Sequence, residues 1–382
     1  MACTNPQIIY IRNSQPIDFM NRTHQQRAVY NKASFKYKKG YIPIEIPCGH
    51  CLCCKLDRAN DWATRVTLES AYWAENCMLT LTYCDEALPH TKHTNKKTLC
   101  KADVQKFIKR LRKRIYTEDK KIFGKNKDLY RKIKYLYCGE YGPKGGRPHY
   151  HMCIFGWKPH DLEFYKTNKH GDVIYKSKTL YKGYKKDEYN GIWGLGFCTV
   201  EDLNYNTACY VARYCTKKAG LTADKPFWKN KPKIKKNPYW KEPNEPLFIL
   251  GKEKWKFKTK PIEMYINGSI GIALRYWETN KERLKRDRKI PIYNNDQLKY
   301  KPLPKYFKKK WKEEDWESYH MAIYEDFKKS QENKKKIVEM ENYPKDWTFE
   351  KKWQEHLKRI AEKLLNRCKR AHLLSRDEGE FT

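Results

Sequence analysis

The chain has 382 residues, with 81 Lys plus Arg against 45 Asp plus Glu, so its formal net charge at neutral pH is +36. A positive excess of this size favours a polyanionic partner, and nucleic acid is the leading candidate. Aromatic residues make up 14% of the chain, which argues against a disordered basic tail and indicates a folded protein.

The N-terminal sequence MACTNPQIIYIRNSQ lacks the apolar run of a signal peptide. No segment approaches the ~18 consecutive apolar residues of a membrane span. We therefore expect an intracellular protein with no membrane partner. Because the cell interior is reducing, the 14 cysteines favour metal binding or packing over disulfides.

The segment CGHCLCC at residues 48–54 carries three cysteines separated by two residues each: Cys48, Cys51 and Cys54. A tetrahedral zinc site needs four thiolate or imidazole ligands, and either Cys3 or His50 would supply the fourth. Cys53 would lie on the other side of the turn. The alternative is a buried cysteine-rich turn that binds no metal.

The next segments predict a helix, a strand and a second helix. Residues 55–73 have roughly helical spacing of their apolar positions, and CMLTLTY at 77–83 alternates as a strand does. Apolar residues at intervals of three and four then predict a helix with basic residues on its other sides: Val104, Phe107, Ile108, Leu111 and Ile115.

The segment KYLYCGEYGPKGGRPHYHMCIF at 134–155 predicts a β-hairpin, because Gly and Pro separate two apolar runs. Residues 156–190 predict a long loop with minor strands, residues 197–200 another strand, and residues 206–219 a helix. This alternation predicts an α+β fold in which an antiparallel sheet is flanked by helices.

The second strand of the hairpin carries His149 and His151 on either side of Tyr150. Side chains alternate along a strand, so both imidazoles share one face. If the turn pairs Glu140 with His149, a carboxylate joins that face, and the set suits Mg²⁺ or Mn²⁺ with positions open to substrate. The alternative is a pair of surface histidines without a metal.

The helix at 206–219 carries Tyr210 and Tyr214 one turn apart, so both hydroxyls face the same region. One active site could use both as nucleophiles. Lys217 follows on the same side and could hold a phosphate beside Tyr214. The alternative is an amphipathic helix that packs two tyrosines into the core.

Three motifs, in this order, resemble those of the HUH endonuclease superfamily: TLTY (80–83), GRPHYH (146–151) and YVARYCTKK (210–218). The paired tyrosines are similar to those of two-tyrosine rolling-circle replication initiators. More narrowly, four shorter words resemble the replication initiators of gokushovirus-type Microviridae, phages with circular single-stranded DNA: CGHCLCC, GEYG, WGLGF (193–197) and PLPKYF (302–307).

The resemblance covers most of residues 1–308 and departs at GSIGIAL (268–274), where relatives tend to carry a Pro-Gly-Ile-Gly word. It implies a ferredoxin-like or RRM-like HUH sheet. We expect a Cys-rich segment at 1–60, an HUH domain at 61–220, a basic Pro-rich linker at 221–260, an accessory segment at 261–308 and a charged helical tail at 309–382.

The resemblance implies that a tyrosine cuts phage DNA at the replication origin, keeps the 5′-phosphate and leaves a 3′-hydroxyl for polymerase. It further implies single-stranded and replicative-form DNA as substrates, host helicase, single-strand-binding protein and polymerase as partners, and the cytoplasm of the bacterial host as location.

Two other functions remain open at this point. A non-catalytic zinc-containing DNA- or RNA-binding protein explains the charge and CGHCLCC, but leaves the paired histidines and tyrosines as coincidence. A nickase or relaxase of a plasmid or transposon would use the same chemistry in another biological role.

Overall fold

The computed structural model describes residues 3–12, 29–30, 41–91, 95–142, 145–168, 171–181, 191–217, 265–294 and 297–370. The expected linker at 221–260 lies outside these residues, and the expected domain boundaries stay a prediction. The chain divides into two compact units. One comprises Met1–Asp61, Tyr276–Pro291 and Lys299–Leu374, and the other Trp62–Arg275, Ile292–Leu298 and Ser375–Thr382.

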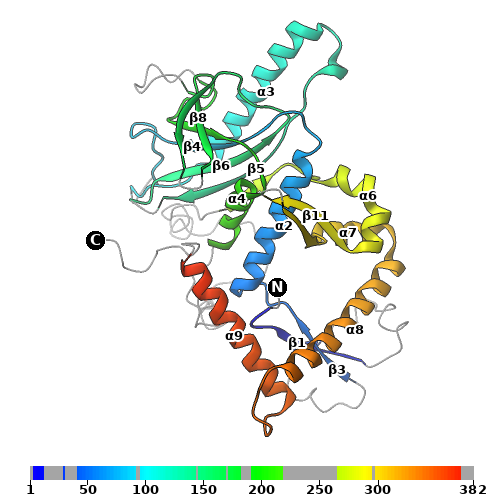
Figure 1. The fold of residues 1–382 in the computed structure, drawn as a ribbon. Helices are drawn as coiled ribbons and strands as arrows, with labels where there is room; N and C mark the ends of the chain where they lie inside the picture. The colour runs from blue at the N-terminus through cyan, green and yellow to red at the C-terminus, as the bar shows by residue number, and fades with distance from the viewer. Residues whose placement is uncertain are drawn as a thin grey trace, which may run out of the picture. The chain divides into compact units, whose positions relative to one another are not determined.

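The unit that contains Trp62–Arg275 is built on a seven-stranded sheet of order β10-β5-β6-β4-β9-β8-β7 (Figure 1). Its neighbouring strands pair antiparallel. The strands are β4 (Asn76–Thr82), β5 (Lys134–Tyr141), β6 (Pro148–Phe155), β7 (Leu162–Thr167), β8 (Val173–Ser177), β9 (Cys198–Glu201) and β10 (Tyr265–Gly268). The prediction of an antiparallel sheet flanked by helices is confirmed.

Helix α3 (Lys101–Phe123) covers one face of this sheet. The five apolar residues that predicted it are all buried, and they pack with Tyr150, Met152 and Ile154 of β6 in one core cluster. Its Lys and Arg side chains point away from this core, as the helical period requires. The strand period of two leaves His149 and His151 on the opposite face of β6.

Helix α4 (Tyr205–Lys217) lies on the face that carries the histidines, because Tyr210 contacts the ring of His151. The helix begins after Asn204, whose side-chain oxygen accepts a hydrogen bond from the backbone N–H of Thr207 at 2.9 Å. This is an N-cap, and it fixes where the helix starts. Ala208, Val211 and Ala212 are buried, so the predicted helix is confirmed as amphipathic.

Two strand assignments differ from the sequence-based expectation. Residues 156–190 were expected to form a long loop with minor strands, yet β7 and β8 form one edge of the main sheet. At the other edge, β10 pairs with β5, with Tyr265 opposite Gly139. This pairing joins segments more than a hundred residues apart, and periodicity within either segment carries no information about it.

The other unit has a three-stranded antiparallel sheet of order β2-β1-β3, formed by β1 (Gln7–Arg12), β2 (Val29–Tyr30) and β3 (Tyr41–Ile46). It also holds the charged helices α7 (Lys305–Glu314), α8 (Trp316–Met340) and α9 (Phe349–Arg370). A small cluster of Val338, Trp353 and Leu357 packs α8 against α9. The prediction of a helical charged C-terminal region is confirmed.

Four elements contain residues of both units: α2 (Leu52–Ser70), α6 (Leu274–Asp287), β11 (Lys289–Asn294) and β12 (Gln297–Pro302). A short 3-10 helix, η3 (Lys127–Leu129), follows α3. Within the described part of the chain, no helix is both long and apolar enough to cross a bilayer.

Candidate metal centre and tyrosine helix

The β5–β6 hairpin sets the register on which the candidate site depends. Glu140 lies directly opposite His149, and Cys138 lies opposite His151. Since side chains alternate along a strand, Glu140, His149 and His151 emerge on the same face of the sheet. The register that made Glu140 a candidate ligand is therefore present.

The three side chains converge closely. Nε2 of His149 lies 2.6 Å from Oε1 of Glu140, and Nε2 of His151 lies 3.2 Å from the same oxygen. Each residue offers one ligand atom, and all three atoms lie within 4.8 Å of one another. The side chains of Glu140 and His151 are each only 5% exposed, whereas His149 is 15% exposed.

The Nδ1 atoms of both histidines have partners of their own. Nδ1 of His151 lies 2.9 Å from the hydroxyl oxygen of Thr80 on β4, and Nδ1 of His149 lies 3.1 Å from the backbone carbonyl oxygen of Arg147. Partners of this kind orient an imidazole and leave Nε2 as the ligating atom. Sequence analysis assigned no such role to Thr80 or Arg147.

Arg147 also fixes the chain that enters β6. Its guanidinium donates to the carbonyl oxygen of Tyr83 through Nη2 at 2.7 Å and to Asp85 through Nη1 at 2.6 Å. These contacts tie the end of the hairpin turn to the loop after β4. The backbone carbonyl that holds His149 is therefore held in place by its own side chain.

The WGLGF segment closes against the same end of β4. Trp193 donates its indole N–H to the carbonyl oxygen of Thr82 at 2.7 Å. A Cβ at Gly196 would lie 2.5 Å from the carbonyl oxygen of Thr82, which is closer than any side chain tolerates. A glycine at this position therefore allows the loop to pack directly on the strand that carries Thr80.

The charge of Glu140 reflects two opposing influences. Burial alone would raise the pKa of its carboxyl group, but hydrogen bonds from His149 and His151 outweigh burial and lower the pKa to about 2. The site therefore holds a carboxylate at neutral pH. A buried carboxylate with two imidazole Nε2 atoms fits a divalent cation that keeps open coordination positions.

Helix α4 brings Tyr210 beside this cluster. The ring centroids of Tyr210 and His151 lie 4.8 Å apart with nearly perpendicular planes, and Tyr210 is 40% exposed. Tyr214 and Lys217 belong to the same helix, but their side chains lie outside the described part of the chain. Of the three residues predicted to act on the phosphate, Tyr210 is the one whose side chain the structure places.

The cysteine cluster forms in the other unit, where the N-terminus meets the start of α2. The sulfur atoms of Cys3, Cys48, Cys51 and Cys54 all lie within 4.8 Å of one another. Backbone N–H groups of His50 and Cys51 donate to the sulfur of Cys48 at 3.4 and 3.2 Å. Of the two fourth ligands considered, the structure therefore brings Cys3 into the cluster.

His50 and Cys53 lie outside this cluster. The side chain of His50 is exposed, whereas Cys53 is fully buried. A hydrogen bond with Cys53 lowers the pKa of Cys51 to about 3, while burial raises the pKa of Cys3 to about 11. One sulfur is thus a thiolate at neutral pH before any cation is bound.

Comparison with known proteins matches the unit that holds the histidines and Tyr210. Residues 76–219 match the family of the replication-associated protein ORF2. The replication-associated protein ORF2 of Spiroplasma virus 4 is 29% identical over 373 residues, which are 97% of each chain. No solved structure matches the chain at a significant level.

Two shorter matches come from other phages. Replication-associated protein VP4 of Bdellovibrio phage phiMH2K is 32% identical over 49% of this chain and 52% of its own. Replication-associated protein ORF4 of Chlamydia phage 1 is 34% identical over 47% of this chain and 40% of its own. The family resemblance of the sequence motifs is thereby confirmed: the chain belongs to the ORF2 family, the replication-associated proteins of gokushovirus-like Microviridae.

Proposed function

We propose that this protein is a metal-dependent HUH endonuclease and strand transferase that starts rolling-circle replication by cutting phage DNA at its origin with a tyrosine. The observation that carries the proposal is the position of Tyr210, whose ring contacts His151 within the Glu140–His149–His151 cluster. Family membership supports a role in phage replication, and the net charge of +36 supports a DNA substrate.

The cutting step is a transesterification. The tyrosine oxygen forms a bond to phosphorus as its proton leaves, and the bond from phosphorus to the 3′ oxygen breaks. The 3′ oxygen takes up a proton and becomes the primer hydroxyl, while the 5′-phosphate stays on the tyrosine. Because the phosphotyrosine ester keeps the energy of the broken bond, the reverse step rejoins the displaced strand without a nucleotide.

His149, His151 and Glu140 would hold the cation, and Thr80 with the carbonyl of Arg147 would keep both imidazoles oriented. Bound Mg²⁺ or Mn²⁺ would polarise a non-bridging phosphate oxygen and offset the charge of the transition state. The 40% exposure of Tyr210 leaves its side of the cluster accessible to a DNA strand.

Two nucleophiles solve a problem of rolling-circle replication, since an enzyme already attached to a 5′ end must cut the regenerated origin. Tyr214 lies one helical turn, about 5–6 Å, from Tyr210. Lys217 follows Tyr214 at a spacing that suits phosphate binding, so Tyr214 makes the first cut and Tyr210 takes the next 5′-phosphate. The substrates are single-stranded and replicative-form origin DNA in the host cytoplasm, with host helicase, single-strand-binding protein and polymerase as partners.

Zinc is the second cation of this proposal, held by Cys3, Cys48, Cys51 and Cys54. Four sulfur ligands form a closed tetrahedral set, which is typical of structural zinc and leaves no position for substrate. The site would link the N-terminus to the start of α2 and contribute its binding energy to folding.

We expect His151→Ala to lower nicking of a single-stranded origin oligonucleotide by at least about 100-fold in Mn²⁺, because even partners of metal ligands are worth 10–100-fold. His160→Ala is the matched control, since its side chain is 73% exposed and remote from the cluster in sequence. DNA binding by gel shift should survive in both variants. Full nicking activity of His151→Ala would refute the metal assignment.

The tyrosines should differ in denaturing-gel assays. Tyr214→Phe should lose most of the first cleavage, Tyr210→Phe should cleave once but terminate poorly, and the double variant should form no covalent adduct. Tyr300→Phe, an exposed tyrosine of β12, is the control. Adducts mapped by mass spectrometry to neither Tyr210 nor Tyr214 would overturn the nucleophile assignment, and a binding protein without catalysis would form none.

Elemental analysis of protein purified without chelator should find one zinc per chain. Cys48→Ser should lose that zinc and melt at a lower temperature, whereas Cys84→Ser, which changes a cysteine outside the cluster, should keep it. Wild-type protein that contains no zinc, or a Cys48→Ser variant that melts at the wild-type temperature, would count against the site.

A further inference from the structure

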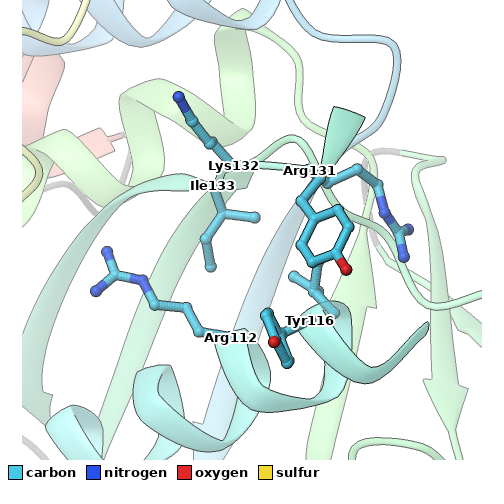
Figure 2. A pocket seen from close by; sticks show the side chains of 7 residues that line it. Arg112, Tyr116, Arg131, Lys132 and Ile133 are labelled. Atoms are coloured by element: carbon cyan, nitrogen blue, oxygen red, sulfur yellow. The ribbon is translucent and has the colours of Figure 1, made fainter. Parts of the chain in front are cut away.

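A pocket of about 360 Å³ lies between the second half of α3 and the segment that leads into β5. Figure 2 shows Arg112 and Tyr116 on the helix, facing Lys132 and Ile133 on that segment. The buried side chains of Ile115 and Ile133 are its apolar lining. A volume of this size falls in the range of sites that bind small organic groups such as a nucleotide.

This pocket is separate from the metal cluster. Both involve β5, but Ile133 precedes the strand and Glu140 lies near its end. Seven residues of extended chain span roughly 20 Å. The pocket is also formed by α3, which covers the sheet face opposite to the histidines. A group bound here therefore cannot be the phosphate that is cut at the cluster.

Two cations at the pocket have no acidic partner within the described residues. Arg112 and Lys132 are exposed, and no carboxylate of the described chain forms an ion pair with either side chain. The guanidinium of Arg112 lies 5.9 Å from the ring of Tyr135. Two such positive charges beside an apolar lining suit a ligand that is both anionic and flat.

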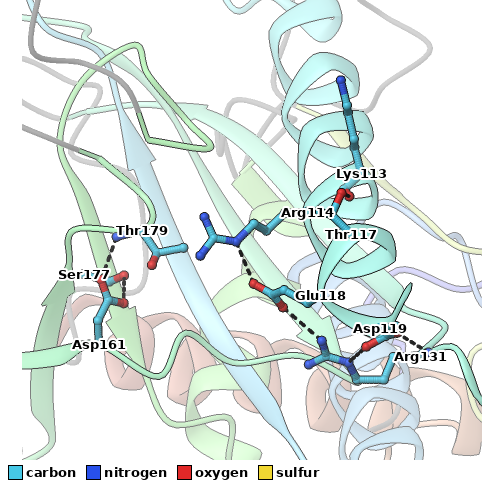
Figure 3. A network of polar contacts seen from close by, with 9 residues as sticks. All are labelled: Lys113, Arg114, Thr117, Glu118, Asp119, Arg131, Asp161, Ser177 and Thr179. Atoms are coloured by element: carbon cyan, nitrogen blue, oxygen red, sulfur yellow. Dashed lines mark hydrogen bonds and ion pairs between the residues drawn. The ribbon is translucent and has the colours of Figure 1, made fainter. Parts of the chain in front are cut away.

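Arg131 plays a different part at the same pocket. Its guanidinium is held by Asp119 at 2.7 Å and by Glu118 at 2.9 Å, and Glu118 also binds Arg114 at 2.6 Å (Figure 3). The backbone N–H of Arg131 donates to Asp119 as well. This network neutralises Arg131 and fixes the segment that carries Lys132.

Two tyrosines form the aromatic wall. Tyr116 is 46% exposed, and its ring meets that of Tyr130 edge to face, with centroids 5.4 Å apart. The hydroxyl of Tyr130 donates to the carbonyl oxygen of Gly124, which anchors that ring. A contact of this kind uses one face of a ring at most, so a flat ligand can still stack on Tyr116.

We propose that this pocket binds an unpaired base of single-stranded DNA, with Tyr116 stacked on the base and Arg112 and Lys132 contacting the neighbouring phosphates. Aromatic stacking next to basic side chains is how proteins bind single strands without reading their sequence. The site goes beyond the proposed cutting reaction, because it would hold a strand roughly 20 Å from the metal cluster, whatever the chemistry there.

Fluorescence anisotropy of the full chain with labelled oligo(dT) tests the proposal. Tyr116→Ala should raise the Kd about tenfold, as expected for the loss of one stacked base. Tyr116→Phe keeps the ring and should bind like the wild type. Lys109→Ala removes an exposed charge of α3 outside the pocket and should weaken binding about twofold at most.

A second measurement uses the unaltered protein. Oligo(dT) that contains 5-iodouracil, irradiated in the complex, should crosslink to the peptide that carries Tyr116 or Tyr130. Unchanged affinity of Tyr116→Ala, or crosslinks only elsewhere in the chain, would overturn the proposal. Equal affinity of the wild type for oligo(dT) and for an abasic oligonucleotide would show a plain polyanion surface and would also overturn it.

Failure of this proposal is distinguishable from failure of the cutting reaction. Tyr116→Ala should still form a covalent adduct with an origin oligonucleotide. His151→Ala should lose the adduct and keep its affinity for oligo(dT). If oligo(dT) binding depends on His151 rather than on Tyr116, the single strand is held at the metal cluster and not at this pocket.

Discussion

The pairing of β5 with β6 is the constraint on which the rest of the candidate site depends. With Glu140 opposite His149, the strand period of two places a carboxylate and two imidazoles on one face and Tyr150, Met152 and Ile154 on the other. A slip of one residue would exchange the two sets. It would bury both histidines under α3 and expose apolar side chains, so the core itself enforces the register of the site.

The sheet thus separates two environments. On one face, α3 closes a core that excludes water, with Phe107 and Trp193 both fully buried. On the other, α4 brings the half-exposed Tyr210 against His151. The hydroxyl of Thr80 reaches from β4 to His151, so three strands and one helix must be assembled before the cluster is oriented. Precise chemistry is built on these rigid elements rather than on loops.

Local patterns in the sequence were enough to predict α3, the β5–β6 hairpin and the shared face of His149 and His151, because each depends on residues close in the chain. The Glu140 register needed only the turn. The β10 edge strand and the contact between Thr80 and His151 depend on pairings between distant segments, and no period within one segment reveals them. Cys3 was one of two candidate fourth ligands, and only the fold of the N-terminus distinguishes it from His50.

Manganese binding tests the central claim most directly, namely that this register creates a cation site. Electron paramagnetic resonance of the full chain titrated with Mn²⁺ should show one site that Glu140→Gln weakens at least about tenfold. Glu163→Gln, which changes a carboxylate that is 42% exposed on β7, should leave it intact. Mn²⁺ binding that is the same in Glu140→Gln and the wild type would contradict the account.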